Sequence, residues 1–224
     1  MRYAYKKQYT WNYDIAYLVG LFASDGCLIN DGRHLNITSK DIEIIHSVEA
    51  ILDLHVKFGI KTSNYNGWGY HLSFSNVALY DFLVGTGLTP AKSLTIGEID
   101  VPDEFYFDFL RGEFDGDGCV RGFKDIRWAN SHMFYIEFTS ASPVFLQFLR
   151  DNNTRLAGTT KGAIHHGKGA DTLSYAKKDS MRLAAAMYYP RPLPSLTRKR
   201  TKLFGFIKQH QTAIIVRNAR VAEW

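Results

Sequence analysis

The stretch AYLVGLFASDGCL spans Ala16–Leu28, and a second stretch, FDFLRGEFDGDGCV, spans Phe107–Val120. Each stretch is largely apolar at helical spacing and ends on an aspartate, a glycine and a cysteine. The two aspartates, Asp25 and Asp117, are 92 residues apart. A pattern that recurs at this distance predicts an internal repeat, in which one structural unit occurs twice in the chain.

The residues around each motif predict the same order of elements: helix, hairpin, helix, hairpin, helix. In the first copy, the alternation in residues 33–40 predicts a strand, and residues 41–54 predict an amphipathic helix capped by Ser39 or Asp41. The alternation in residues 56–61 predicts a further strand. In the second copy, the sequence IEFTS at 136–140 parallels LNITS at 35–39, so the same arrangement is expected there.

These observations predict an α+β fold of two pseudo-symmetric αββαββα halves, each with an antiparallel sheet. We expect the first half at residues 1–92 and a linker at 93–104, which contains Pro102. The second half is expected at residues 105–224, with a basic helix after Pro194.

The composition is that of a core-forming chain, because 46% of the 224 residues are hydrophobic and 22% are charged. The net charge of +5 favours an anionic partner such as nucleic acid, although a solvated basic surface would give the same value. Cys27 and Cys119 do not form CxxC pairs, so we expect no zinc site. We expect an intracellular protein of a prokaryotic cytoplasm or an organelle, neither secreted nor in a membrane, because the sequence lacks a signal peptide and a long apolar run.

Small residues are spaced four apart in each motif: Gly20 and Ser24 in the first, Gly112 and Gly116 in the second. A glycine inside a helix costs about 1 kcal/mol relative to alanine, so it calls for a reason in packing. Small residues at this spacing allow two helix backbones to approach closely. The sequence therefore predicts that the two motif helices pack together across a pseudo-two-fold axis.

This packing would bring Asp25 and Asp117 together at one end of the helix pair, with Gly26 and Gly118 as cap residues. A carboxylate at a helix C-terminus lies in an unfavourable field, and two close carboxylates repel each other. A divalent cation such as Mg²⁺, which prefers oxygen ligands, would relieve both effects. The alternative is that the aspartates only end their helices and stay solvated.

Asp115 has no acidic counterpart in the first copy, where Ala23 stands. It is not part of the symmetric pair, and we expect it to pair with Arg111, four residues earlier, on a surface face.

The sequences LVGLFASDG at 18–26 and LRGEFDGDG at 110–118 resemble the two signature motifs of LAGLIDADG homing endonucleases. The resemblance covers nearly the whole chain and is to the single-chain, monomeric members. It implies a DNA endonuclease that makes a double-strand cut in a long DNA target by metal-dependent phosphodiester hydrolysis and leaves short 3′ overhangs. It also implies that the two sheets form a DNA-binding saddle in the major groove, and that Ca²⁺ binds without supporting the cleavage that Mg²⁺ supports.

The same resemblance implies roles for individual residues at the motif ends. Asp25 and Asp117 match the metal-binding acids, assisted by the backbone carbonyls of Ser24 and Gly116.

Lys92, in TPAKS, matches the catalytic basic residue of the first half. Its partner in the second half is expected to be Lys199, with Lys202 and Arg198 as rivals; contact with phosphate or solvent alone is the alternative role for this group.

Base contacts are expected from residues on the strand faces opposite the core. In the first half these residues are Arg33, His34, Asn36, Lys57, Lys61, His71 and Ser73. In the second half they are Arg121, Phe123, Glu137, Thr139, Lys161 and His165.

Two other functions fit the same fold. One is an intron RNA-splicing maturase, with intron RNA as the partner, and the other is a catalytically inactive DNA-binding protein. The presence of both Asp25 and Asp117 argues against the inactive protein.

Overall fold

The computed structural model describes residues 8–62, 67–124, 132–160 and 162–222. Within these ranges the predicted αββαββα order is confirmed in both halves. The first half consists of α1 (Tyr13–Ser24), β1 (Gly26–Leu28), β2 (His34–Ser39), α2 (Ile42–Leu52), β3 (Gly59–Thr62), β4 (Trp68–Ser75) and α3 (Val77–Gly85). The second half consists of α4 (Tyr106–Gly116), β5 (Cys119–Lys124), β6 (His132–Ser140), α5 (Pro143–Ala157), β7 (Gly162–His165), β8 (Asp171–Ala176) and α6 (Lys177–Met187).

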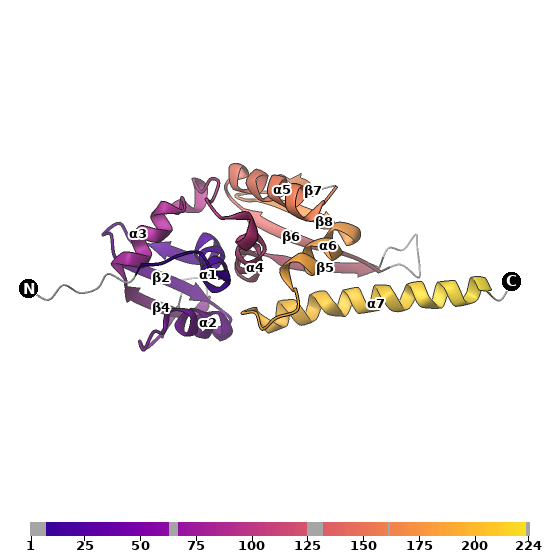
Figure 1. Ribbon diagram of the computed structural model, residues 1–224, viewed down its shortest axis with the longest axis horizontal. Helices are drawn as coiled ribbons and strands as arrows, with labels where there is room; N and C mark the ends of the chain where they lie inside the picture. The colour runs from indigo at the N-terminus through magenta and orange to yellow at the C-terminus, as the bar shows by residue number, and fades with distance from the viewer. Residues whose placement is uncertain (1–7, 63–66, 125–131, 161, 223–224) are drawn as a thin grey trace, which may run out of the picture.

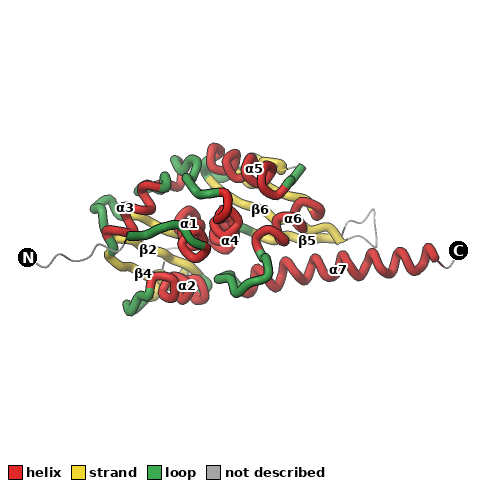
Figure 2. Tube along the Cα trace, in the orientation of Figure 1, coloured by secondary structure: helices red, strands yellow, loops and turns green. Residues whose placement is uncertain are grey.

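Two short 3₁₀ helices, η1 (Lys92–Leu94) and η2 (Asp103–Phe105), lie between the halves, and a long helix, α7 (Thr197–Ala222), follows α6. Figure 1 shows α1 and α4 side by side at the centre of an elongated molecule, with one sheet in each half. Helix α7 begins near the centre and runs along the second half to the C-terminal end. The tube in Figure 2 shows that the helices lie over one side of each sheet. No helix in these described ranges is long and apolar enough to cross a membrane.

Each half contains one four-stranded antiparallel sheet, with the equivalent strand orders β1-β2-β4-β3 and β5-β6-β8-β7. The central strands alternate buried and accessible residues, as in β2, where Leu35 and Ile37 are fully buried and their neighbours are not. Phe134 and Ile136 are buried in the same way on β6. Each sheet therefore has one face packed against helices and one face free to contact a ligand.

The predicted strand over residues 56–61 is wrong at its start. The chain leaves α2 through Asp53 in a left-handed conformation, and β3 begins only at Gly59. All four residues of β3 are exposed, including Ile60 at 68%. Because β3 is an edge strand that pairs with β4 alone, its apolar alternation does not mark a buried face.

Candidate active site

The site begins with the close contact between α1 and α4, which depends on two glycines. A Cβ atom on Gly20 would lie 2.1 Å from the backbone oxygen of Phe109, and one on Gly112 would lie 2.1 Å from that of Tyr17. Neither position has room for a side chain. The two helix backbones are therefore in direct contact, and this contact fixes where both helices end.

The ends of the two helices also interlock. A Cβ atom on Gly116 would lie 1.9 Å from Ser24 Oγ and 3.7 Å from Asp25 Cγ. The Ser24 hydroxyl itself donates to the carbonyls of Gly20 and Leu21, both at 3.2 Å. The carboxyl group of Asp25 therefore lies over the last turn of α4, the helix that Asp117 ends.

Asp25 and Asp117 occupy equivalent positions, each directly after the last residue of its helix. Burial, followed by repulsion from Asp117, raises the pKa of Asp25 to about 6. Burial also raises the pKa of Asp117, while Lys199 and Lys92 act to lower it. The structure therefore brings the two acids together in a partly buried place that disfavours their negative charge.

Gly26 and Gly118 do not cap these helices as predicted. Neither glycine has a positive φ. Gly26 is the first residue of β1, and Gly118 directly precedes β5. A Cβ atom on Gly26 would come within 2.4 Å of Phe22, and one on Gly118 within 2.5 Å of Phe114. Both positions need glycine because the chain turns back over an aromatic ring of the preceding helical turn.

A buried lysine binds the end of each motif helix. Lys92 is 6% exposed, and its Nζ donates to the backbone oxygens of Gly26 at 2.7 Å and Ser24 at 3.3 Å. Lys199 is 7% exposed. Its Nζ donates to three carbonyls of the last turn of α4, those of Phe114, Asp115 and Gly116, at 2.8, 2.9 and 2.8 Å.

These lysines are equivalent in the two halves, and burial lowers the pKa of each. The rivals of Lys199 lie elsewhere: Lys202 is exposed, and the guanidinium of Arg198 binds the carboxylate of Asp41. Of the three candidates in the second half, the structure brings Lys199 to the end of α4.

The donor atoms fit a hard cation such as Mg²⁺. Within the described ranges, no group of three or more His, Cys, Asp or Glu side chains could hold a metal ion. Mg²⁺ is usually bound by one or two carboxylates, with substrate phosphates and water completing its shell, and Asp25 and Asp117 offer that set. The carbonyls of Ser24 and Gly116 already accept lysine hydrogen bonds, and each oxygen retains a second lone pair.

The prediction that Asp115 pairs with Arg111 on a surface is wrong, because α4 has no exposed face at these positions. Asp115 is buried, and its Oδ2 accepts from Tyr17 Oη at 2.9 Å and from the backbone N–H of Leu196 at 2.7 Å. The fully buried Arg111 instead binds Asp108, with 2.7 Å between Nη2 and Oδ1.

Glu113 is a buried acid that sequence reasoning missed. Burial and the nearby charge of Asp117 raise its pKa well above the usual value, and its Oε2 has no hydrogen-bond partner among the described residues. The signal was present in the repeat, because the equivalent residue 92 positions earlier is Leu21. A carboxyl group where the first copy has leucine indicates a polar interior specific to the second half.

The register of the first sheet places most of its predicted contact residues on one face. Asn36 pairs with Ser73, and Thr38 pairs with His71. Lys61 of β3 pairs with position 69, two residues before His71, and is therefore on the same face. The residues of this face named as predicted contacts are His34, Asn36, Lys61, His71 and Ser73. Arg33 is exposed in the turn before β2, whereas Lys57 lies in the loop before β3.

The second sheet presents the equivalent face. Its members among the predicted residues are Arg121, Phe123, Glu137, Thr139 and His165, and Lys161 lies outside the described residues.

The same face contains Tyr135, which the prediction missed. Its ring stacks on Phe123 at 5.9 Å, and the guanidinium of Arg121 lies 5.4 Å from its centroid. Arg121 also binds Glu137 at 2.7 Å. The strand alternation could have identified Tyr135, because it lies two residues before Glu137.

Comparison with known proteins matches part of the chain to a family model. Residues 12–82 match the family model described as a LAGLIDADG-like domain. No curated protein matches the chain significantly. The first half therefore carries a LAGLIDADG-like domain, and both halves together have the two-domain LAGLIDADG fold.

Solved structures of this fold match nearly the whole chain at low identity. The homing endonuclease I-WcaI bound to its DNA recognition sequence has 15% identity and a TM-score of 0.61, over 88% of this chain and 90% of that one. The LAGLIDADG meganuclease I-AabMI bound to uncleaved DNA has 13% identity and a TM-score of 0.56, over 93% and 92%. Full-length DUF199/WhiA from Thermatoga maritima has 12% identity and a TM-score of 0.59, over 94% and 67%.

The fold is therefore shared with endonucleases and with WhiA, whose name states no nuclease activity, so the fold alone does not establish catalysis.

Proposed function

We propose that this protein is a site-specific homing endonuclease, a monomer that makes a double-strand cut in a long DNA target by Mg²⁺-dependent hydrolysis and leaves short 3′ overhangs. The observation that supports this function most strongly is the duplicated arrangement at the α1–α4 ends. Asp25 and Asp117 meet there, and each helix end is bound by its own buried lysine, Lys92 or Lys199. A protein that only bound DNA would gain nothing from two repelling acids at this point.

The chemistry follows from the residues at this junction. Asp25 and Asp117 would hold the metal, which when bound supplies a Lewis acid and lowers the pKa of its water. Lys92 and Lys199 place an ammonium group at each end of the pseudo-symmetric pair, where it offsets charge that develops on a scissile phosphate. One lysine for each half corresponds to one cut in each DNA strand.

Recognition is assigned to the two free sheet faces. Their accessible side chains include hydrogen-bonding groups of the kinds that read base edges, such as Asn36 and Arg121. The net charge of +5 favours a polyanion. The DNA-bound state of I-WcaI and I-AabMI supports the same partner.

The test is a selection of cleaved sites from a randomised duplex library, carried out with Mg²⁺ and, in parallel, with Ca²⁺. We expect cleaved products with Mg²⁺ only, and loss of cleavage with retained DNA binding in Asp25→Asn and Asp117→Asn. Asp151→Asn, at an exposed position of α5, is the matched control and should cut normally. Sequence-specific binding with no cut in either metal would instead assign the chain to the non-cleaving DNA-binding proteins of this fold.

A further inference from the structure

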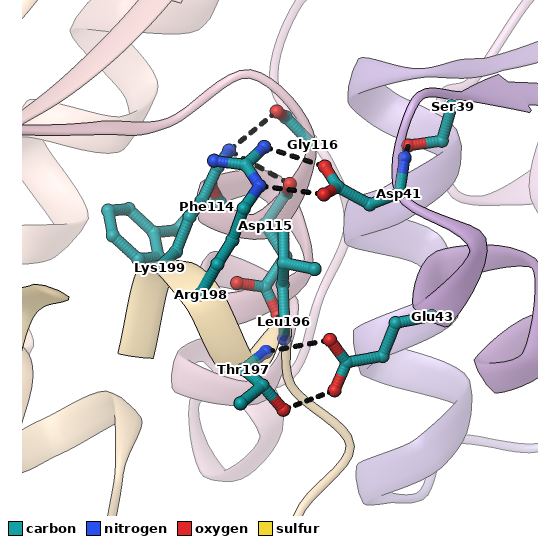
Figure 3. Close-up of polar contacts among 10 residues, drawn as sticks. All are labelled: Ser39, Asp41, Glu43, Phe114, Asp115, Gly116, Leu196, Thr197, Arg198 and Lys199. Atoms are coloured by element: carbon teal, nitrogen blue, oxygen red, sulfur yellow. Dashed lines mark hydrogen bonds and ion pairs between the residues drawn. The ribbon is translucent and has the colours of Figure 1, made fainter. Parts of the chain in front are cut away.

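Four polar residues join the first half to the start of α7, and we call them the inter-half clasp: Asp41, Glu43, Thr197 and Arg198. The Arg198 guanidinium donates to both carboxylate oxygens of Asp41, at 2.7 and 2.6 Å. Glu43 accepts from the backbone N–H of Thr197 at 2.9 Å and also from its hydroxyl group. Figure 3 shows the two acids, both from the first half, reaching across to the first turn of α7.

The clasp lies directly beside the candidate catalytic lysine of the second half. Leu196, the residue before Thr197, donates its N–H to buried Asp115. Lys199, the residue after Arg198, binds the last turn of α4. The outer residues of the segment 196–199 are therefore bound by α4, and the two between them by the first half (Figure 3). The first turn of α7 is thus held both by α4 and by the first half, and the Lys199 backbone is part of that turn.

Lys92 is held in a different way. Its ammonium group binds the carbonyls of Ser24 and Gly26, which belong to its own half. Its own carbonyl accepts from the N–H groups of Thr95 and Ile96, at 2.9 and 2.7 Å, within the short η1 turn. The hydrogen bonds that fix Lys92 thus lie within its own half, whereas some of those that fix the turn of Lys199 cross between the halves.

Asp41 and Glu43 are also closely tied to the DNA-facing sheet. Asp41 follows β2 after a single intervening residue, Lys40, and its N–H donates to the hydroxyl of Ser39 at 3.2 Å. Glu43 is in the first turn of α2. Both acids therefore lie within four residues of the end of β2, whose other residues face the candidate DNA site.

We propose that Asp41 and Glu43 are positioning residues for Lys199, so that the first half of the protein sets the cleavage competence of the second. This inference rests on the proposed nuclease function for its catalytic consequence, but the placement of Lys199 is independent of it. The acids touch neither DNA nor metal in this scheme, and they act through Thr197 and Arg198.

The first test measures the accessibility of Lys199 and does not require activity. The full chain and the double variant Asp41→Asn/Glu43→Gln are treated with a trace of an amine-acylating reagent, and each lysine is quantified by mass spectrometry. We expect acylation of Lys199 to become about tenfold faster in the variant. The variant loses charge-assisted hydrogen bonds worth about 1.4 kcal/mol, and this free energy corresponds to a factor of about ten. Acylation of Lys92 should be unchanged.

The matched control is Asp103→Asn, because Asp103 forms another exposed carboxylate–arginine pair, with Arg155, and the two lysines hydrogen-bond to other groups. This variant should leave the acylation of Lys199 at the wild-type rate. Thermal melting of all variants verifies that they are folded at the labelling temperature. Equal Lys199 acylation in the wild type and the double variant would overturn the proposal, as would a parallel rise at Lys92.

The second test follows each DNA strand separately, on a target with different labels on its two strands. The double variant should cut one strand about tenfold more slowly than the other and accumulate nicked duplex, with unchanged DNA affinity. The charge exchange Asp41→Arg with Arg198→Asp should restore part of the lost rate. Equal slowing of both strands overturns the positioning role. A wild type that cuts no duplex overturns the nuclease function, and the acylation result then still decides the placement of Lys199.

Discussion

Replacing the Asp25 carboxylate by an amide should stabilise the metal-free protein. Burial and the charge of Asp117 raise the pKa of Asp25 from 3.8 to about 6. The folded protein therefore binds this proton more tightly than the unfolded chain does. The protonated Asp25 therefore contributes its full stability at a pH below the pKa of the unfolded chain. This stability is lost as the pH rises through the pKa of the folded protein.

The expected magnitude follows from that shift. A change in pKa from 3.8 to about 6 corresponds to about 3 kcal/mol between the charged and neutral forms. Asparagine has nearly the shape of aspartate and carries no charge at any of these pH values. In the presence of a chelator, Asp25→Asn should therefore gain up to about 3 kcal/mol in free energy of unfolding at pH 8, and close to nothing near pH 4.

Urea unfolding at both pH values, with a chelator, measures this gain. Asp31→Asn is the control of opposite sign, because hydrogen bonds from His34 lower the pKa of the exposed Asp31 to about 2 and its replacement should bring no gain. Mg²⁺ at a hundred times its dissociation constant should then add about 2.7 kcal/mol to the wild type and little to Asp25→Asn. A variant less stable than the wild type at pH 8, or a gain independent of pH, would refute the electrostatic reasoning.

Three further predictions concern packing, buried polarity and DNA contact. Gly20→Ala should lower the free energy of unfolding in urea by about 1–3 kcal/mol, because its Cβ would clash with the backbone of α4, whereas Gly85→Ala, with open space around it, should not. Tyr17→Phe should lower it by about 1–3 kcal/mol at neutral pH, since buried Asp115 loses a hydrogen bond; an unchanged urea midpoint contradicts this. Lys61→Ala should reduce the slope of log affinity against log salt by about 0.9 if it contacts a phosphate, and a DNA titration at several salt concentrations measures that slope.

Local patterns were sufficient to predict the repeat and the arrangement of its elements. Strand alternation and helical spacing depend on neighbouring residues, so they identified β2, α2 and their counterparts. The spacing of Gly20 and Gly112 predicted a contact between helices far apart in the sequence, because only a close backbone gives a reason for glycine there. The same reasoning misassigned Gly26, where the cause is the ring of Phe22 and not the backbone conformation.

The surroundings of α4 could not be predicted from its own sequence. Arg111 and Asp115 have the spacing of a surface ion pair, and only the tertiary structure shows that both are covered. Each has a partner about eighty residues later, since Arg111 binds the carbonyl of Pro194 and Asp115 binds the N–H of Leu196. A pattern within one helix contains no information about a segment that reaches it from so far along the chain.

The buried charges of α4 have a common consequence for the candidate site. In the first half, Lys92 follows α3 closely and reaches the end of α1 by a short local turn. In the second half the chain must travel from the end of α6 to the end of α4 before Lys199 can bind there. Arg111 and Asp115 bind that connecting segment, whereas the equivalent positions of α1, 19 and 23, are apolar. The two copies of the repeat thus differ because the second lysine is delivered by a longer connection, which the charged interior of α4 holds in place.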